Sequence, residues 1–149
     1  MIGEPQLRMI LLLHAMATWI MCGIIWFVQI VHYPLLQKVG AGEFVDYERA
    51  NCRLTTFVVG PPMLLELFTM VALFRWRPAA IPLSLIVGGA VLLAIIWMGT
   101  YTVQVPQHAR LREQFSAALV DKLVSGNWVR TVCWSARGLI VFEMLRRVM

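Results

Sequence analysis

Residues 54–74 read LTTFVVGPPMLLELFTMVALF, and Glu66 is the only ionisable side chain among them. A second apolar stretch, NWVRTVCWSARGLIVFEML at residues 127–145, carries Arg137 near its middle. A single charge at the centre of a membrane-crossing helix costs about 2.5–3.5 kcal/mol on insertion scales. Charges kept at that cost usually face the interior of a helical bundle and pair with one another. Glu66 and Arg137 therefore predict both the fold and the region where the chain works.

The apolar residues of the chain are gathered into long runs. The 149 residues are 60% hydrophobic and 14% charged, whereas soluble domains are about 45–50% apolar and about 25% charged. A crossing helix needs about 20 residues, and we expect one domain, residues 1–149, with four spans at approximately 9–32, 54–75, 79–105 and 127–146. The fourth span can cross only if its charged side chains are shielded from lipid.

These observations predict an all-α integral membrane four-helix bundle with both termini on the same side. That side is called A here, and the opposite side B. Short interfacial helices are expected in the two long loops, within residues 38–53 and over residues 107–122. Pro34 and Pro106 are expected to end the first and third spans, and Pro61 and Pro62 to kink the second.

Charge and targeting signals place the chain in a membrane without deciding its orientation firmly. The net charge is +5, but the basic residues sit mostly at span ends, which indicates anchoring in a lipid bilayer and not nucleic-acid binding. The first apolar run is too long for a signal peptide. We expect a bacterial inner-membrane protein. Side B carries more basic residues, yet the tight turn at residues 75–77 and the tail at Arg146 and Arg147 favour cytoplasmic termini.

Polar and aromatic side chains recur at a spacing of three and four in every span, so each helix carries one polar face. Most of these polar side chains lie in the half of the membrane near side B, which predicts a pocket open to side B and closed at side A. A through-pore would need polar lining at both ends. The residues assigned to binding a substrate in this pocket are Gln29, Tyr33, Arg53, Tyr101, Gln104, Asn127, Arg130, Arg137, Trp26, Trp97 and Trp134.

Depth along the helices supports a Glu66–Arg137 pair. Glu66 lies about 18 Å and Arg137 about 15 Å from the side-B ends of their spans, at 1.5 Å per residue. The pair has two interpretations: a salt bridge that fixes the register of the helices, or the floor of a pocket in which Glu66 accepts a proton.

Two histidines are further candidates, because His32 and His108 are both expected near side B. Either one is a candidate general base at the pocket mouth. Together with Glu66 they would form a two-histidine, one-carboxylate metal site. The alternative is that both are ordinary interfacial residues. No motif identifies a cofactor, and Cys22, Cys52 and Cys133 form neither a CxxC pair nor a zinc knuckle.

Two short segments, TVQVPQHARL at residues 102–111 and NWVRT at residues 127–131, together with the sequence HYPL at residues 32–35, resemble the anthrone-oxygenase-like group of small bacterial four-span membrane proteins. This resemblance implies oxidation of a polycyclic phenol by oxygen without an obvious bound cofactor.

Three classes of function remain open from the sequence. The first is an oxidoreductase or oxygenase acting on an aromatic or quinone-like small molecule, with His108 or His32 as the base and the arginines stabilising a phenolate. The second is a haem- or metal-binding membrane protein. The third is a non-catalytic membrane subunit in which the Glu66–Arg137 pair is structural. The small residues 88–94 leave room for a partner or for a homo-oligomer.

Overall fold

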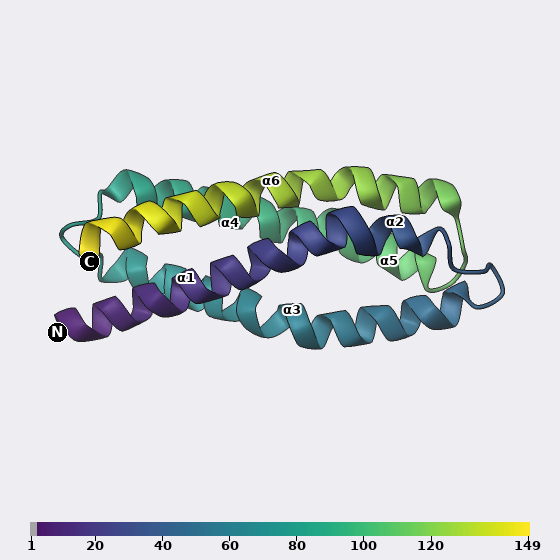
Figure 1. The fold of residues 1–149 in the computed structure, drawn as a ribbon, viewed down its shortest axis with the longest axis horizontal. Coiled ribbons are helices and arrows are strands. Elements are labelled where there is room, and N and C mark those ends of the chain that lie inside the picture. The colour runs from purple at the N-terminus through teal and green to yellow at the C-terminus, as the bar shows by residue number, and fades with distance from the viewer. Residues whose placement is uncertain (1–2) are drawn as a thin grey trace.

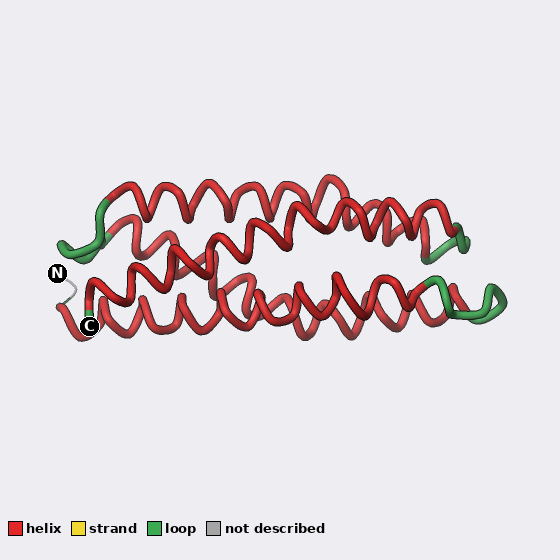
Figure 2. The backbone as a smooth tube through the Cα atoms, turned by 45° about the horizontal axis from the view of Figure 1, so that its top comes forward, coloured by secondary structure: helices red, strands yellow, loops and turns green. Residues whose placement is uncertain are grey.

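The computed structural model describes residues 3–149, and all regular elements in that range are helices (Figures 1 and 2). Taken in chain order, these helices make four long rods. The rods run alongside one another, with the loops at the two ends of the bundle (Figure 2). Two rods are composite, since each contains a π-helical turn, η1 or η2. The elements are α1 (Glu4–Phe27), η1 (Val28–His32), α2 (Tyr33–Leu36), α3 (Phe44–Arg75), α4 (Leu83–Gly99), η2 (Thr100–Gln104), α5 (Val105–Leu111) and α6 (Ala117–Val148).

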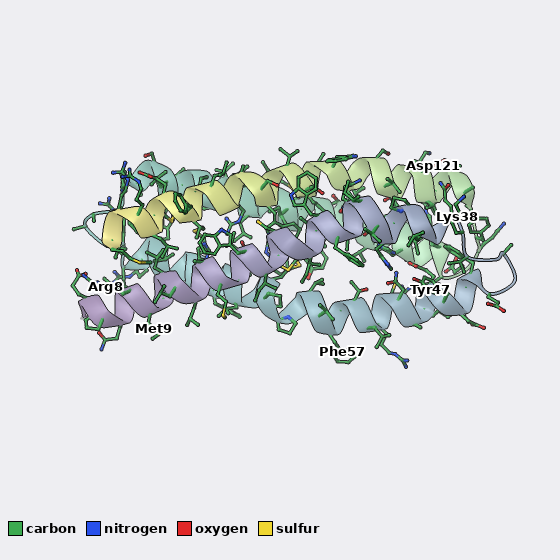
Figure 3. The ribbon with its side chains drawn as sticks, in the orientation of Figure 1. Arg8, Met9, Lys38, Tyr47, Phe57 and Asp121 are labelled. Atoms are coloured by element: carbon green, nitrogen blue, oxygen red, sulfur yellow. The ribbon has the colours of Figure 1, made fainter. Side chains whose placement is uncertain are left out.

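Three of the rods are long and apolar enough to cross a membrane: Glu4–Leu36, Phe44–Arg75 and Leu83–Leu111. The chain is therefore compatible with an integral membrane protein. The outward side chains agree, since Phe57 points away from the bundle with 73% of its surface exposed (Figure 3). The rod α6 is equally long but is not among the three, because it carries more charged residues.

Prolines do not end the first and third rods, which corrects the expectation from sequence. The first rod continues past Pro34 to Leu36, and the third continues past Pro106 to Leu111. In each rod a π-helical turn comes just before the proline. The Tyr33 N–H, for example, bonds the carbonyl of Val28, five residues back. The wider turn gives the proline ring room beside the preceding carbonyls, so the helix goes on.

The separate loop helices expected from sequence are absent from the described residues. Residues 44–53 are the first turns of α3, residues 107–111 belong to α5, and residues 117–122 begin α6, whose N-cap Ser116 accepts a hydrogen bond from the Leu119 N–H. The rods thus extend beyond the predicted spans towards side B. Pro61 and Pro62 lie inside α3, which continues through them as one helix.

Packing is tightest around α6, which lies against both α1 and α4, whereas α3 contacts α1 closely and α4 only sparsely. Both chain ends lie at the same end of the bundle (Figure 1), and Arg8 lies there too, while Lys38 and Asp121 lie at the opposite end (Figure 3). Side A and side B keep these meanings below. The side-A half holds a dry core made of Leu11, Ala15, Met70, Leu73, Ile81, Ile86, Leu93, Val141, Met144 and Leu145.

A smaller apolar cluster closes the bundle at its side-B end. It brings together Leu36, Phe44, Leu111, Val120 and Leu123, which are all fully buried. These residues come from the helix ends that the sequence analysis treated as loops, so this closure was not foreseen.

Two of the small residues of α4, Gly88 and Gly89, face neighbouring helices of the same chain. A Cβ atom built on Gly88 would lie 3.8 Å from Ile140, and one on Gly89 would lie 3.1 Å from Met70 and 3.7 Å from the Arg137 guanidinium. These glycines permit the close contact between α4 and α6.

Gly138 provides a test of the tight α1–α6 contact. A Cβ atom at this position would lie 3.2 Å from Cys22 Sγ and 3.5 Å from the Trp19 ring. Gly138→Leu should force the two helices apart and destabilise the protein by about 1–3 kcal/mol, the usual cost of overpacking. Gly23→Leu is the matched control, because nothing lies within 4 Å of its Cβ position. Thermal unfolding in detergent measures both variants, and equal midpoints would contradict the close packing.

Candidate functional site

Glu66 and Arg137 form the buried ion pair that the sequence predicted. Both side chains are almost completely inaccessible. Arg137 Nε and Nη2 donate to Glu66 Oε1 at 2.9 and 2.8 Å. The prediction of a pair joining the second and fourth rods is thus confirmed.

Further hydrogen bonds to the ion pair come from α1, α4 and α6, so that all four rods meet at this point. Thr18 Oγ1 of α1 donates to Glu66 Oε1 at 2.7 Å, and Trp134 Nε1 of α6 donates to Oε2 at 3.2 Å. Arg137 Nη1 donates to the carbonyl of Gly89 on α4. His14 lies between Arg137 and Thr69, with its Nε2 3.3 Å from Nη2 and its Nδ1 2.8 Å from the threonine hydroxyl.

We call these six side chains the inner cluster: His14, Thr18, Glu66, Thr69, Trp134 and Arg137. None of them lines the cavity described next. A fully partnered, buried charge pair of this kind fixes helix register. The arrangement favours the structural interpretation of Glu66 and Arg137 over a role as a pocket floor.

A cavity of about 440 Å³ lies between the inner cluster and side B, and it is bounded by α1–α2, α3, the α4–α5 rod and Arg130 of α6. Its rim includes the exposed side chains Leu64, Tyr101 and Val105. The cavity therefore opens sideways between α3 and the α4–α5 rod, where the helices contact each other least. The sequence predicted an opening to side B instead, but the helices extend further and their ends close that route.

Five side chains at the side-B end of this cavity form what we call the His108 cluster: Tyr33, Glu48, Asn51, Cys52 and His108. His108 Nδ1 lies 2.5 Å from Glu48 Oε1, and its Nε2 lies 3.0 Å from the Tyr33 hydroxyl. Asn51 Nδ2 donates to Glu48 Oε2 at 3.0 Å, and Cys52 Sγ donates to Oε1 at 3.3 Å.

The chain of hydrogen bonds from the Glu48 carboxylate through the His108 imidazole to the Tyr33 phenol determines the proton chemistry of this cluster. An ionised Glu48 accepts the Nδ1 proton and so holds the tautomer in which His108 Nε2 is free to accept a proton. The same logic orients histidine bases in hydrolases. Glu48 is fully buried, so its negative charge is compensated by these hydrogen bonds and by any proton on His108.

Unsatisfied polar atoms are concentrated on the cavity wall. Within residues 3–149, five buried side-chain atoms have no hydrogen-bond partner, and four of them belong to cavity-lining residues: His32 Nε2, Trp97 Nε1, Gln104 Oε1 and Arg130 Nε. Buried polar groups are almost always satisfied in native proteins. The four residues that carry these atoms therefore place unused hydrogen-bonding capacity beside the cavity.

The predicted pocket residues divide into those that reach the cavity and those that do not. The cavity wall contains His32, Tyr33, Trp97, Tyr101, Gln104, His108 and Arg130. Trp97 and Tyr101 are stacked there, with ring centroids 5.6 Å apart.

Other predicted pocket residues connect the first rod to α6 instead. Gln29 Nε2 donates to the carbonyl of Val124 at 3.1 Å, and Gln29 Oε1 accepts from Asn127 Nδ2 at 3.0 Å. Trp26 Nε1 donates to Ser135 Oγ at 3.1 Å. The polar stripe of the first rod thus joins one neighbouring helix and does not line a shared pocket.

Two further expectations from sequence are wrong. Arg53 is exposed and outside the cavity, because its position on α3 turns it outward. The metal set His32, His108 and Glu66 does not assemble, since the Glu66 oxygens are occupied within the inner cluster.

Glu48, Asn51 and Cys52 were missed because residues 38–53 looked like a polar loop. The signal was present, however: positions 48, 52 and 55 continue the polar face of α3 at a spacing of four and three.

Comparisons with known proteins add nothing to this geometry, because no family model, curated protein or solved structure matches the chain.

The structural role of the ion pair predicts a specific pattern of stabilities. Arg137→Met alone leaves the Glu66 charge buried without its partner, so it should destabilise the protein by about 3–5 kcal/mol. Adding Glu66→Gln removes that charge, and the double variant should recover much of the loss. Unfolding by denaturing detergent measures both variants.

Glu143→Gln serves as the control, because this carboxylate pairs with Arg146 and Arg147 at the exposed end of α6; it should change stability little. A double variant as unstable as Arg137→Met would contradict the assignment.

Proposed function

We propose that the protein is a four-span integral membrane protein that binds a small aromatic molecule bearing hydroxyl or carbonyl groups, a phenol or quinone, in the side-B cavity and acts on it as an oxygenase-like oxidoreductase. The observation that carries the proposal is the cavity itself, whose wall combines a stacked aromatic pair with residues that have unpartnered polar atoms, next to a carboxylate–imidazole–phenol chain. We place it in a bacterial inner membrane with its termini in the cytoplasm.

The outer face of α6 supports a fourth span. Val132, Leu139 and Phe142 are 62%, 73% and 58% exposed, whereas Arg130 and Arg137 are turned inward at 9% and 1%. A helix with an apolar outer face and its arginines turned into the bundle can cross a bilayer at lower cost than one whose charges face lipid. The position of α6 alongside α1 and α4 supports a crossing together with them.

The cavity wall indicates the class of ligand. Trp97 Nε1 and Arg130 Nε are donors without acceptors, and Gln104 Oε1 is an acceptor without a donor. A ligand that satisfies them carries both a carbonyl or phenolate oxygen and a hydroxyl. The remaining wall is largely apolar or aromatic, and a volume of about 440 Å³ lies in the range of small-molecule pockets. Phenols and quinols with fused rings meet these requirements.

The His108 cluster supplies the proton chemistry of the proposal. A ligand hydroxyl bonded to the Tyr33 oxygen passes its proton through Tyr33 to His108 Nε2, and Glu48 stabilises the resulting imidazolium. The Arg130 guanidinium stabilises the phenolate that remains. A phenolate gives up electrons to oxygen far more readily than a phenol does. The resemblance to the anthrone-oxygenase-like group supports oxygen as the acceptor.

Ligand titration tests the binding step. Naphthol and naphthoquinone added to the detergent-purified protein should quench tryptophan fluorescence saturably, because Trp97 lines the cavity. His108→Ala should weaken naphthol binding about tenfold or more, since it leaves the hydroxyl without its acceptor chain. Trp76→Phe is the control, because Trp76 lies in the turn after α3, outside the cavity. Absence of saturable binding would refute the ligand class.

Oxygen uptake with anthrone as the substrate tests the reaction itself. The wild-type protein should consume oxygen, and His108→Ala should not. Unchanged uptake in this variant would remove His108 from the mechanism.

Membrane topology tests the fourth span. Four crossings place both termini on the same side, whereas three crossings would place them on opposite sides. Protease-cleavable tags at the N- and C-terminus of separate proteins should therefore give the same protection pattern in sealed membrane vesicles. A tag inserted at residues 40–42, in the loop between α2 and α3, should give the opposite pattern. Termini on opposite sides would exclude α6 as a span.

A further inference from the structure

Glu48, Cys52 and His108 present three different ligand types to one point. Glu48 and Cys52 are one helical turn apart on α3, and His108 faces them from α5. One carboxylate oxygen, the thiol sulfur and one imidazole nitrogen all lie within 4.8 Å of one another. Helical bundles build their metal sites in this way, from side chains one turn apart on one helix and a side chain on the facing helix.

The chemistry of the three donors is selective. Thiolate, imidazole and carboxylate together suit zinc and its first-row neighbours, and they do not suit calcium or magnesium, which take oxygen ligands. In the cluster, a divalent ion would face one carboxylate and one thiolate, so the two ligand charges neutralise the ion. This matters inside a bundle, where an uncompensated charge is costly.

The remaining polar atoms of Glu48 and His108, which do not face this point, already form hydrogen bonds with other side chains. The Tyr33 hydroxyl bonds His108 Nε2 at 3.0 Å and leaves Nδ1 directed at Glu48. Asn51 holds the other carboxylate oxygen at 3.0 Å. Metal sites need such outer partners to fix the orientation of the ligands, and here they exist without any ion.

We propose that Glu48, Cys52 and His108 bind one divalent transition-metal ion of the zinc type at the side-B end of the cavity. On binding, the ion takes the place of the proton on His108 Nδ1; the neutral imidazole then carries its proton on Nε2 and donates it to the Tyr33 oxygen, and the Cys52 thiol releases its proton to solvent. Three protein ligands leave a fourth position open, as in catalytic zinc sites. The cavity adjoins the site, since Cys52 and His108 both line it, and His32 lines it with its Nε2 unpartnered.

The test of this site uses the metal alone, so its outcome does not depend on whether a phenol or quinone binds in the cavity. The full-length protein is purified in detergent, stripped with a chelator and titrated with Co²⁺. The expected result is one Co²⁺ per chain, with visible bands of a four-coordinate ion and a near-ultraviolet thiolate-to-cobalt charge-transfer band, all displaced by Zn²⁺.

Variants identify the ligands. Cys52→Ser should abolish the charge-transfer band and weaken Co²⁺ binding at least tenfold, and Glu48→Gln should weaken binding while the band remains. Cys133→Ser is the control, since Cys133 lies on α6 outside the cluster, and its spectrum should match the wild type. Circular dichroism verifies that each variant is folded. Failure of the wild-type protein to take up stoichiometric Co²⁺, or a charge-transfer band that survives Cys52→Ser, would overturn the proposal.

Discussion

The structure depends on one buried ion pair whose every hydrogen bond must be satisfied inside an apolar bundle. Glu66 on α3 and Arg137 on α6 have almost no access to solvent, so the surrounding helices must supply the partners that water cannot. Thr18 and His14 of α1 and the Gly89 carbonyl of α4 do so. Sliding any one rod along its axis would leave a buried charge or donor unpaired, at a cost of several kcal/mol. The pair therefore sets the register of all four rods.

That register divides the bundle into two unlike halves. Towards side A, Leu11, Leu73 and Met144 belong to a continuous apolar core, while near the level of the pair α1 is joined to α6 by side-chain hydrogen bonds to the Trp134 and Gly138 carbonyls. Towards side B, α3 and the α4–α5 rod separate around the cavity. The apolar side-A half packs the helices together, and the half around the cavity contains the unpartnered polar groups. Separating the two tasks lets a small chain keep reactive groups in an otherwise apolar interior.

The ion pair and the bundle could be predicted from sequence because a lone charge in an apolar run has few places to go. The helix ends could not be predicted. Pro34 and Pro106 indicate helix ends in the sequence, but the π-helical turns before them accommodate each proline, so the helices continue. Misplacing those ends hid Glu48 and Cys52, which belong to α3 and not to a loop. Helical periodicity also identified a polar face on the first rod, but it did not show which helix this face would contact. Trp26 and Gln29 were therefore assigned to the pocket, although they contact α6.

The most direct test of the central claim measures the pair itself in a lipid bilayer. Solid-state NMR dipolar recoupling between ¹⁵N-labelled arginine guanidinium groups and the ¹³C-labelled side-chain carboxyl carbons of glutamate reports their separation, and the Glu66→Gln variant identifies the signal of this pair. The structure, with 2.8 Å between Arg137 Nη2 and Glu66 Oε1, predicts a strong coupling that disappears in the variant. A spectrum in which the variant loses no coupling would mean that the two charges do not meet, and the register, the cavity and the proposals built on them would fail together.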